Sequence, residues 1–210
     1  MDVTIRPLGE RALLCEVSSL QQVAALHALM EQADLPGVTE LVPAARTLML
    51  RVEKRAVLEG LGVHITNLAS RLDETAELGQ NAGEEVEIKV RYDGEDLDDV
   101  AKHTGLSTRE VIAAHTETSW TVGFFGFAPG FAYLVGGDSR LVVPRRDEPR
   151  TKVPPGAVAL AGEFSAVYPR TSPGGWQLIG STADQMWDTD REPPALLSPG
   201  ATVRFVKARR

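Results

Sequence analysis

Proline and glycine are distributed very unevenly along this 210-residue chain, and this distribution most constrains its fold. Ten of the 13 prolines lie between Pro129 and Pro199, interspersed with many of the glycines. Because both residue types interrupt helices and mark turns, this part of the chain is expected to form only short strands joined by turns. Such a pattern is typical of a closed or nearly closed β-barrel.

The N-terminal part has a different pattern, in which strands and helices alternate. Residues 12–17, 38–43 and 47–52 have strand patterns, and the last two alternate like a pair of neighbouring strands. Helical spacing of apolar residues occurs over residues 20–30, behind a serine cap, and again over residues 65–72. This order predicts a small α+β layer domain.

A polar, aperiodic segment at residues 78–85 predicts a linker, so we expect domains at residues 1–83 and 84–210. In the second domain, residues 86–92 alternate like a strand and residues 96–115 have a helical pattern. The remaining strands are predicted at residues 121–125, 141–143, 157–161, 166–168, 176–179 and 202–206.

Composition indicates the class of protein and the cellular compartment to expect. The chain is 43% hydrophobic and 24% charged with a net charge of −7, values typical of a globular protein. It has no run of 18 apolar residues, so we expect no membrane span. A single cysteine, Cys15, fits a reducing compartment, and the first residues lack the layout of a signal peptide. We therefore expect a cytoplasmic location.

Residues 97–112 have the appearance of a helix-turn-helix, with Gly105 at the turn and Ser107 as a cap. A DNA-binding unit should present basic residues to phosphates, but acidic residues outnumber Lys102 and Arg109 here. We therefore predict no nucleic-acid binding and interpret the segment as two short helices packed on the barrel.

Common sequence signatures of catalytic and metal sites are absent. The chain contains no Gly-x-x-x-x-Gly-Lys-Ser/Thr string, no Gly-x-Gly-x-x-Gly and no Gly-x-Ser-x-Gly. No closely spaced cysteine and histidine pattern indicates a metal site. The sequence therefore predicts neither a metal site nor a complete nucleotide site.

An aromatic run at residues 120–134 is the most unusual local feature. Four of the six phenylalanines lie between Phe124 and Phe131, and the Pro129-Gly130 pair predicts a sharp turn among them. Neighbouring residues of a strand point to opposite faces, so part of this run is expected in the core and part at a mouth of the barrel. The run fits simple packing, a pocket lining or an interface.

A basic run follows at residues 144–156, where prolines stiffen a segment that carries Arg145, Arg146, Arg150 and Lys152. Arginine is suited to bidentate binding of a carboxylate or phosphate, and lysine supplies a point charge. A third run, residues 168–180, contains a Pro-Gly-Gly turn that leads into a strand. We expect both runs to contribute to a site for an anionic ligand or to an acidic partner surface.

Three motifs in this region occur in the same order as in a known family. They are Gly126-Phe127-x-Pro129-Gly130-Phe131-x-Tyr133-Leu134, Pro144-Arg145-x-x-x-Pro149-Arg150-x-x-Val153-Pro154 and Tyr168-Pro169-x-x-x-Pro173-Gly174-Gly175-Trp176. Together with Gly9-Glu10-Arg11-Ala12-Leu13-Leu14 and Gly37-Val38-Thr39-Glu40-Leu41-Val42-Pro43, they resemble the KipI / allophanate hydrolase subunit 1 family. The resemblance covers nearly the whole chain.

This resemblance implies a small N-terminal α/β domain and a C-terminal cyclophilin-like β-barrel, an α+β architecture that agrees with the glycine and proline distribution. The implied activity is that of an ATP-dependent 5-oxoprolinase, in which such a chain is one of several subunits. The implied partners are a KipA-like protein (allophanate hydrolase subunit 2) and a LamB/YcsF-like protein. ATP is expected to be handled by the assembled complex, and the chain alone is expected to be inactive.

Two other functions are open within the same family. A KipI-type member inhibits a sensor histidine kinase, in which case the aromatics around Phe127 and Phe131 form an interface. Other relatives are allophanate hydrolase or urea-carboxylase-related subunits.

We predict one site at a mouth of the barrel. His115 is the candidate for proton transfer, and Arg145, Arg150 and Lys152 are candidates for stabilising developing negative charge. The predicted substrate-binding residues are Phe125, Phe127, Pro129, Phe131, Tyr133 and Gln177. Alternative roles are a capped helix end for His115 and partner binding for the arginines.

Overall fold

The computed structural model describes residues 1–70 and 84–208. The chain divides into two compact units, one within residues 1–80 and one within residues 81–210. The predicted linker at residues 78–85 lies outside the described residues except for Glu84 and Glu85, as do the last two residues of the helical pattern at 65–72. The exact boundary between residues 83 and 84 stays a prediction.

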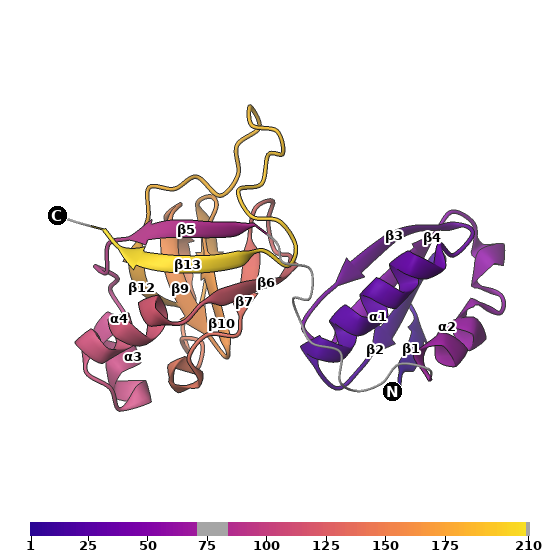
Figure 1. Cartoon of the computed structure of the whole chain (residues 1–210), viewed down its shortest axis with the longest axis horizontal. Helices are drawn as coiled ribbons and strands as arrows, with labels where there is room; N and C mark the ends of the chain where they lie inside the picture. The colour runs from indigo at the N-terminus through magenta and orange to yellow at the C-terminus, as the bar shows by residue number, and fades with distance from the viewer. Residues whose placement is uncertain (71–83, 209–210) are drawn as a thin grey trace. The chain divides into compact units, whose positions relative to one another are not determined.

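The N-terminal unit is a four-stranded antiparallel sheet with two α-helices packed against it (Figure 1). The sheet has the order β1-β2-β4-β3, and the predicted pairing of residues 38–43 with 47–52 is confirmed. The strands are β1 (Thr4–Pro7), β2 (Ala12–Glu16), β3 (Val38–Pro43) and β4 (Thr47–Val52). The helices are α1 (Leu20–Ala33), α2 (Leu61–Ala69) and the short 3-10 helix η1 (Arg55–Leu58).

The core of this unit follows from the periodicities of its elements. Ser19 caps α1 by accepting a hydrogen bond from the Gln22 amide at 3.3 Å. The buried face of α1 and alternate residues of β2 and β4 then exclude water together. These buried residues are Leu13, Cys15, Leu20, Val23, Leu26, Met30, Leu48 and Leu50.

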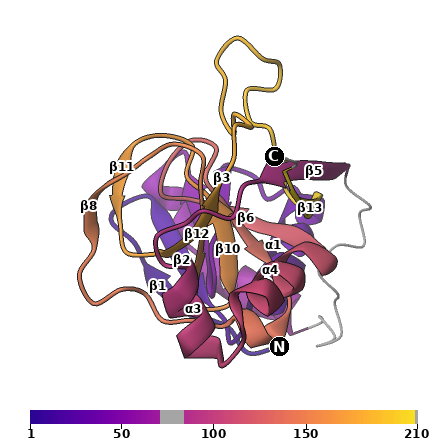
Figure 2. The ribbon, with the colours of Figure 1, turned by 90° about the vertical axis from the view of Figure 1, so that its left-hand side faces the viewer.

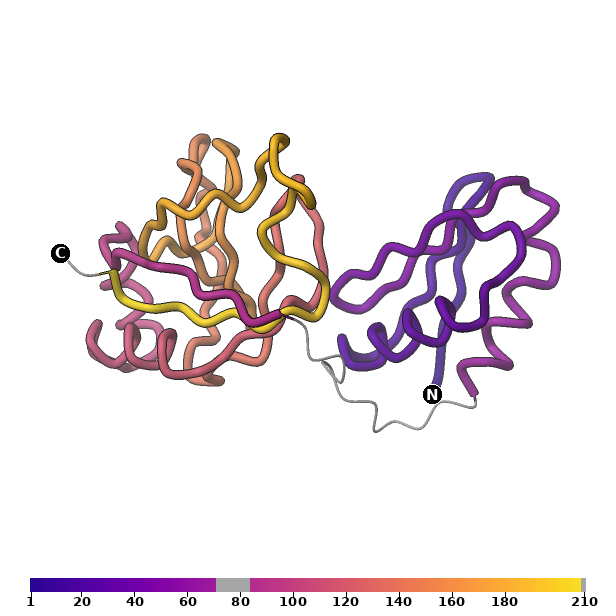
Figure 3. The backbone as a smooth tube through the Cα atoms, turned by 45° about the horizontal axis from the view of Figure 1, so that its top comes forward, coloured from indigo at the N-terminus to yellow at the C-terminus, as the bar shows by residue number. Residues whose placement is uncertain are grey.

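The C-terminal unit is a nearly closed barrel of seven strands in the order β12-β9-β10-β7-β6-β13-β5. β5 and β13 run parallel and side by side (Figure 3). Arg91 and Ser181 form a bridge with two backbone hydrogen bonds of 2.8 Å, which brings the two edges of the sheet together. The strands are β5 (Glu85–Val90), β6 (Trp120–Phe125), β7 (Ala132–Val135), β9 (Ala157–Ala161), β10 (Phe164–Val167), β12 (Gln177–Ser181) and β13 (Thr202–Lys207).

Beside the barrel, β8 (Arg150–Val153) and β11 (Ser172–Gly174) form a separate two-stranded ribbon (Figure 2). The predicted strand at residues 141–143 is wrong. Residues Ser139–Leu141 form a 3-10 turn, η2, and Val143 makes only an isolated bridge to Gly162. The apolar side chains of Leu141 and Val143 are nevertheless buried, so the alternating pattern reflects burial rather than strand pairing.

The helix-turn-helix-like segment consists of α3 (Leu97–Thr104) and α4 (Thr108–Glu117). Gly105 ends α3 in the left-handed conformation with φ of 72°, and Ser107 forms a capping box with Glu110. α3 contacts β12 and α4 contacts β13, so both helices pack on the barrel as expected. No helix in the described ranges is both long and apolar enough to cross a membrane.

Candidate functional site

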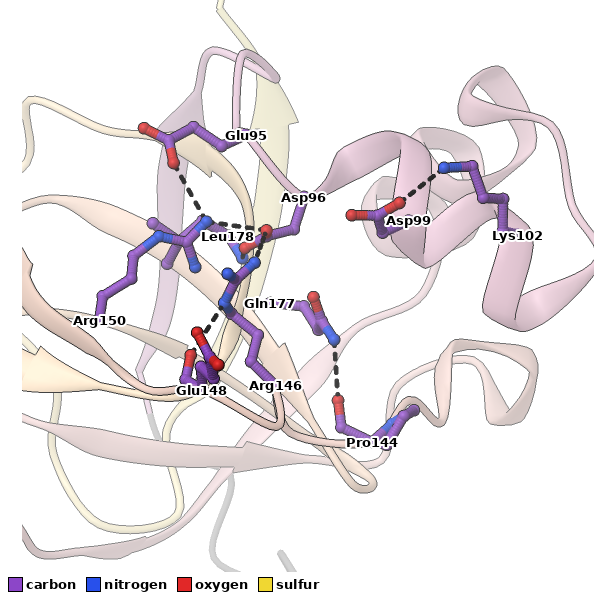
Figure 4. A network of polar contacts seen from close by, with 10 residues as sticks. All are labelled: Glu95, Asp96, Asp99, Lys102, Pro144, Arg146, Glu148, Arg150, Gln177 and Leu178. Carbon is purple, nitrogen blue, oxygen red and sulfur yellow. Dashed lines mark hydrogen bonds and ion pairs between the residues drawn. The ribbon is translucent and has the colours of Figure 1, made fainter.

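Asp96, immediately before α3, is the centre of a buried ionic cluster. Its side chain is almost entirely buried, with a residue exposure of 1%. Its Oδ1 accepts hydrogen bonds from Arg146 Nη1 at 2.7 Å and from Arg150 Nη2 at 2.8 Å (Figure 4). Its Oδ2 accepts from the backbone amide of Leu178 in β12 at 2.7 Å. One carboxylate therefore holds the basic loop, the start of α3 and the strand β12 together.

The charges in this cluster are balanced by these contacts. Burial by itself would raise the pKa of Asp96, but hydrogen bonds from Arg150 and Leu178 and the charges of both arginines lower it below its usual value. The hydrogen bond to Asp96 in turn raises the pKa of Arg150. Arg150 also contacts Glu95 at 3.1 Å. Arg146 and Arg150 are therefore structural cations that share the carboxylate of Asp96, and Arg150 has Glu95 as a second carboxylate partner.

Gly94 explains how Asp96 reaches β12. A Cβ atom at Gly94 would lie 2.3 Å from the carbonyl oxygen of Leu178, so only glycine permits this approach of the two backbones. The Asp96 amide donates to the same carbonyl at 2.9 Å. Asp96 and Leu178 are thus joined by two hydrogen bonds: the Asp96 amide donates to the Leu178 carbonyl, and the Leu178 amide donates to the Asp96 side chain.

The basic loop is also anchored at its start. The Arg146 amide donates to Gly175 O at 2.8 Å, and the side chain of Gln177 donates from Nε2 to Pro144 O at 3.1 Å. Gln177 is a buried polar residue with an exposure of 4%. These bonds fix the loop against the turn that leads into β12.

A pocket of about 390 Å³ lies between this loop and α3. Its lining is polar and contains charges of both signs. The lining residues are Asp99, His103, Pro144, Arg145, Arg146, Asp147, Glu148 and Gln177. Asp99 is paired with Lys102 at 2.7 Å, on the α3 side of the pocket (Figure 4).

Arg145 is the cation that this pocket leaves available. Its side chain is exposed, and its guanidinium carbon lies 6.0 Å from the centre of the Trp176 ring, a distance compatible with a cation–π contact. It forms no ion pair with any residue in the ranges 1–70 and 84–208. Arg145 therefore remains free to bind an anionic group.

The aromatic run forms a contiguous layer that continues from Trp176. The Phe131 ring packs edge-on against Trp176 with 5.6 Å between centroids, and Phe127 packs against both Phe131 and Tyr168. The Pro129-Gly130 turn is confirmed, with φ of 77° at Gly130. Phe131 is buried and Tyr133 is partly buried, whereas Phe127 and Pro129 are exposed.

Phe127 has an unusual backbone conformation. Its φ is 65°, and the Ala128 amide donates to Gly126 O at 2.7 Å, as in a γ-turn with positive φ. Positive φ is costly for a bulky side chain, and such strain is often found at functional positions. The turn holds the Phe127 ring 58% exposed at the edge of the aromatic layer.

His115 lies away from this pocket. Its side chain is fully buried, stacked on Phe205, and its ring nitrogens contact Tyr92 Oη at 2.8 Å and Ser165 Oγ at 2.9 Å. Burial lowers the pKa of His115 to about 3. The structure therefore does not bring His115 together with Arg145 or Arg150, because both nitrogens already have partners in the barrel core.

The structure separates the other predicted residues as well. Arg145 and Gln177 share the pocket, whereas Arg150 is held by Asp96. Lys152 is exposed on β8 and does not line the pocket, and Phe125 packs partly buried against the main core. The sequence does not predict Asp96, Asp99 or His103 as site residues, and it predicts Arg146 only as a member of the basic run. In the sequence, the acidic residues at the start of α3 serve only as an argument against DNA binding. No local sequence pattern indicates that Asp96 is buried.

The described ranges hold no group of three or more His, Cys, Asp or Glu side chains arranged to hold a metal ion.

The fold belongs to a class of carboxyltransferase-type structures. The urea carboxylase of Kluyveromyces lactis superimposes with a TM-score of 0.79 at 17% identity, over 99% of this chain and 22% of that chain. At this identity the likeness concerns the fold alone. The chain belongs to the family described as carboxyltransferase domain, subdomain C and D, whose family model matches residues 3–197.

Relatives of nearly the same length are more informative. The B subunit of the 5-oxoprolinase of Escherichia coli O157:H7 is 36% identical over 95% of this chain and 93% of its own length. The protein of the same name from Haemophilus influenzae is 37% identical over 97% of each chain. The solved structure of TTHA0988 is 36% identical with a TM-score of 0.76, but this chain, matched over 95% of its length, spans only 40% of that one.

Proposed function

We propose that this chain is the B subunit of an ATP-dependent 5-oxoprolinase, which opens the lactam of 5-oxoproline to give glutamate. The observation that carries this proposal is the similarity to B subunits of 5-oxoprolinases over at least nine tenths of both chains. A match over the full length includes the N-terminal unit and the barrel, so it concerns more than a shared barrel fold.

The reaction requires activation because an unstrained lactam is a poor electrophile. Transfer of the γ-phosphoryl group of ATP to the lactam oxygen makes the ring carbon electrophilic. Addition of water and cleavage of the C–N bond release the amine and leave an acyl phosphate, which a second water hydrolyses to glutamate and phosphate. Arg145 is exposed and lines the pocket, which supports a role for it in binding an anionic group of the reacting ligand, whereas Lys152 lies outside the pocket.

We propose that ATP is bound by the assembled complex, with a KipA-like and a LamB/YcsF-like protein as partners in the cytoplasm. The described residues include no glycine-rich phosphate loop, and the pocket carries acidic as well as basic side chains. The TTHA0988 chain supports the proposal that this protein acts with partners, because the matching region of TTHA0988 is joined to further polypeptide.

Co-expression with both partners should yield a complex that releases glutamate from 5-oxoproline, and only in the presence of ATP. An Arg145→Gln variant should lower kcat/KM at least about tenfold, because a charge-assisted contact to the reacting ligand is lost. Arg109→Gln, which removes an exposed arginine on α4, is the matched control and should retain activity.

A folded complete complex that releases no glutamate would exclude the proposed function. Copurification with a sensor histidine kinase, in place of the two partners, would instead favour a KipI-type inhibitor, with exposed Phe127 as an anchor of the interface.

A further inference from the structure

The chemistry of a lactam defines what a recognising side chain must offer. A five-membered lactam is a cis amide, so its N–H and its C=O lie on one edge of the ring. A primary carboxamide complements this edge, because it presents one acceptor and one donor side by side. In 5-oxoproline a carboxylate is attached to the carbon next to the ring nitrogen, so the ligand also needs a cation near the lactam edge.

Gln177 offers such a carboxamide in a fixed orientation. Pro144 O can only accept a hydrogen bond, so the amino group of Gln177 must face it, at 3.1 Å. The Oε1 atom then lies on the side away from Pro144 (Figure 4). The second N–H of Nε2 has no bonding partner among residues 1–70 and 84–208. Gln177 as a residue is 4% exposed and lines the pocket, so burial and the bond to Pro144 restrain its side chain while part of the residue faces the pocket.

The cations around the pocket differ in what they can bind. Arg146 and Arg150 both donate to Asp96, so each already has a carboxylate partner that holds it in place. Arg145 has no such partner in the described ranges, and its guanidinium carbon lies 6.0 Å from the centre of the Trp176 ring. Asp99, Asp147 and Glu148 also line the pocket and repel a carboxylate. Among the lining cations, Arg145 is the one without a carboxylate partner in the described ranges, so it is the group with which an acidic ligand can pair.

We propose that Gln177 recognises the lactam edge of the substrate and that Arg145 binds its carboxylate, so that this pair determines specificity for a lactam acid. The assignment rests on the proposed function and adds which residue binds which group. In this assignment the substrate is recognised by one arginine and one amide, each with its own task, and not by the whole set of basic residues in the loop.

Binding of three small ligands to the assembled complex separates these tasks. The probes are 5-oxoproline, 2-pyrrolidinone, which lacks the carboxylate, and proline, which lacks the lactam carbonyl. Titration calorimetry should show the wild-type complex binding 5-oxoproline most tightly. Gln177→Met, close in size but without a carboxamide, should lower the affinity for both 5-oxoproline and 2-pyrrolidinone by about tenfold. Arg145→Gln should lower the affinity for 5-oxoproline to a similar degree and leave the affinity for 2-pyrrolidinone unchanged.

The outcomes distinguish this inference from the proposed function. Glutamate release with an unchanged KM for Gln177→Met would overturn the role of Gln177 and leave the function intact. An equal loss of 2-pyrrolidinone binding in both variants would also overturn the separate roles of Gln177 and Arg145. The same holds if the wild-type complex binds none of the three ligands. Conversely, selective binding without turnover would support the inference and count against the function. Should Gln177→Met fail to fold, Gln177→Asn, which withdraws the amide by one methylene, takes its place with the same expected losses.

Discussion

Replacement of Asp96 by alanine should lower the free energy of unfolding of the barrel unit by about 3–5 kcal/mol. The reason is that removal of one partner from a buried ionic cluster leaves the others uncompensated. Arg150 would remain largely buried without its main acceptor, and the Leu178 amide would lose its hydrogen bond. Urea unfolding followed by tryptophan fluorescence measures this directly, because all three tryptophans lie in the barrel unit.

Asp99→Asn is the matched control, since Asp99 forms an exposed pair with Lys102 in the same helix. Exposed pairs contribute little, so this variant should stay within about 0.5 kcal/mol of the wild type. Asp96→Asn should fall between the two, because an amide oxygen in the place of Oδ1 can still accept from both arginines, whereas the negative charge and the acceptor for the Leu178 amide are lost. A loss below about 1 kcal/mol for Asp96→Ala would show that the cluster does not hold the loop in place.

The stability of the barrel should fall by about 2 kcal/mol between pH 7.5 and pH 5 because of His115. The folded state holds this histidine neutral, with a pKa of about 3, whereas the unfolded chain protonates it near its ordinary value of 6.5. Between these values the unfolded state binds more protons, so stability is fully present above pH 6.5 and is lost as the pH falls toward 3. The measurement is urea unfolding at both pH values.

His115→Gln should remove this pH dependence, whatever its effect on stability at pH 7.5. His103→Gln, which removes an exposed imidazole of the same unit, should retain it. Asp96 does not interfere, because its pKa is lowered from 3.8 and its contribution is lost only at more acidic pH. An unchanged pH dependence in His115→Gln would contradict a buried neutral histidine.

Local patterns predicted many elements of the fold well. The pair of strands at 38–43 and 47–52 and the strand at 157–161 have the predicted bounds. Gly105 and Ser107 correctly marked the end of one helix and the start of the next. Hydrophobic periodicity and capping act over a few residues, so they can be recognised without knowledge of the tertiary structure. Short strands such as β8 and β11 were missed, since they carry little of this pattern.

The site was predicted only in part, for a physical reason. An α+β unit, a barrel, and the aromatic and basic runs near the pocket can be predicted from the sequence, because they follow from local composition. Which basic side chains have a carboxylate partner depends on how remote segments pack. The partner of Arg150 is 54 residues away in the chain and reaches it through closure of the barrel, whereas Arg145 has no such partner within the described residues. Ion pairing and burial depend on distances between remote segments, and these distances have no local signature.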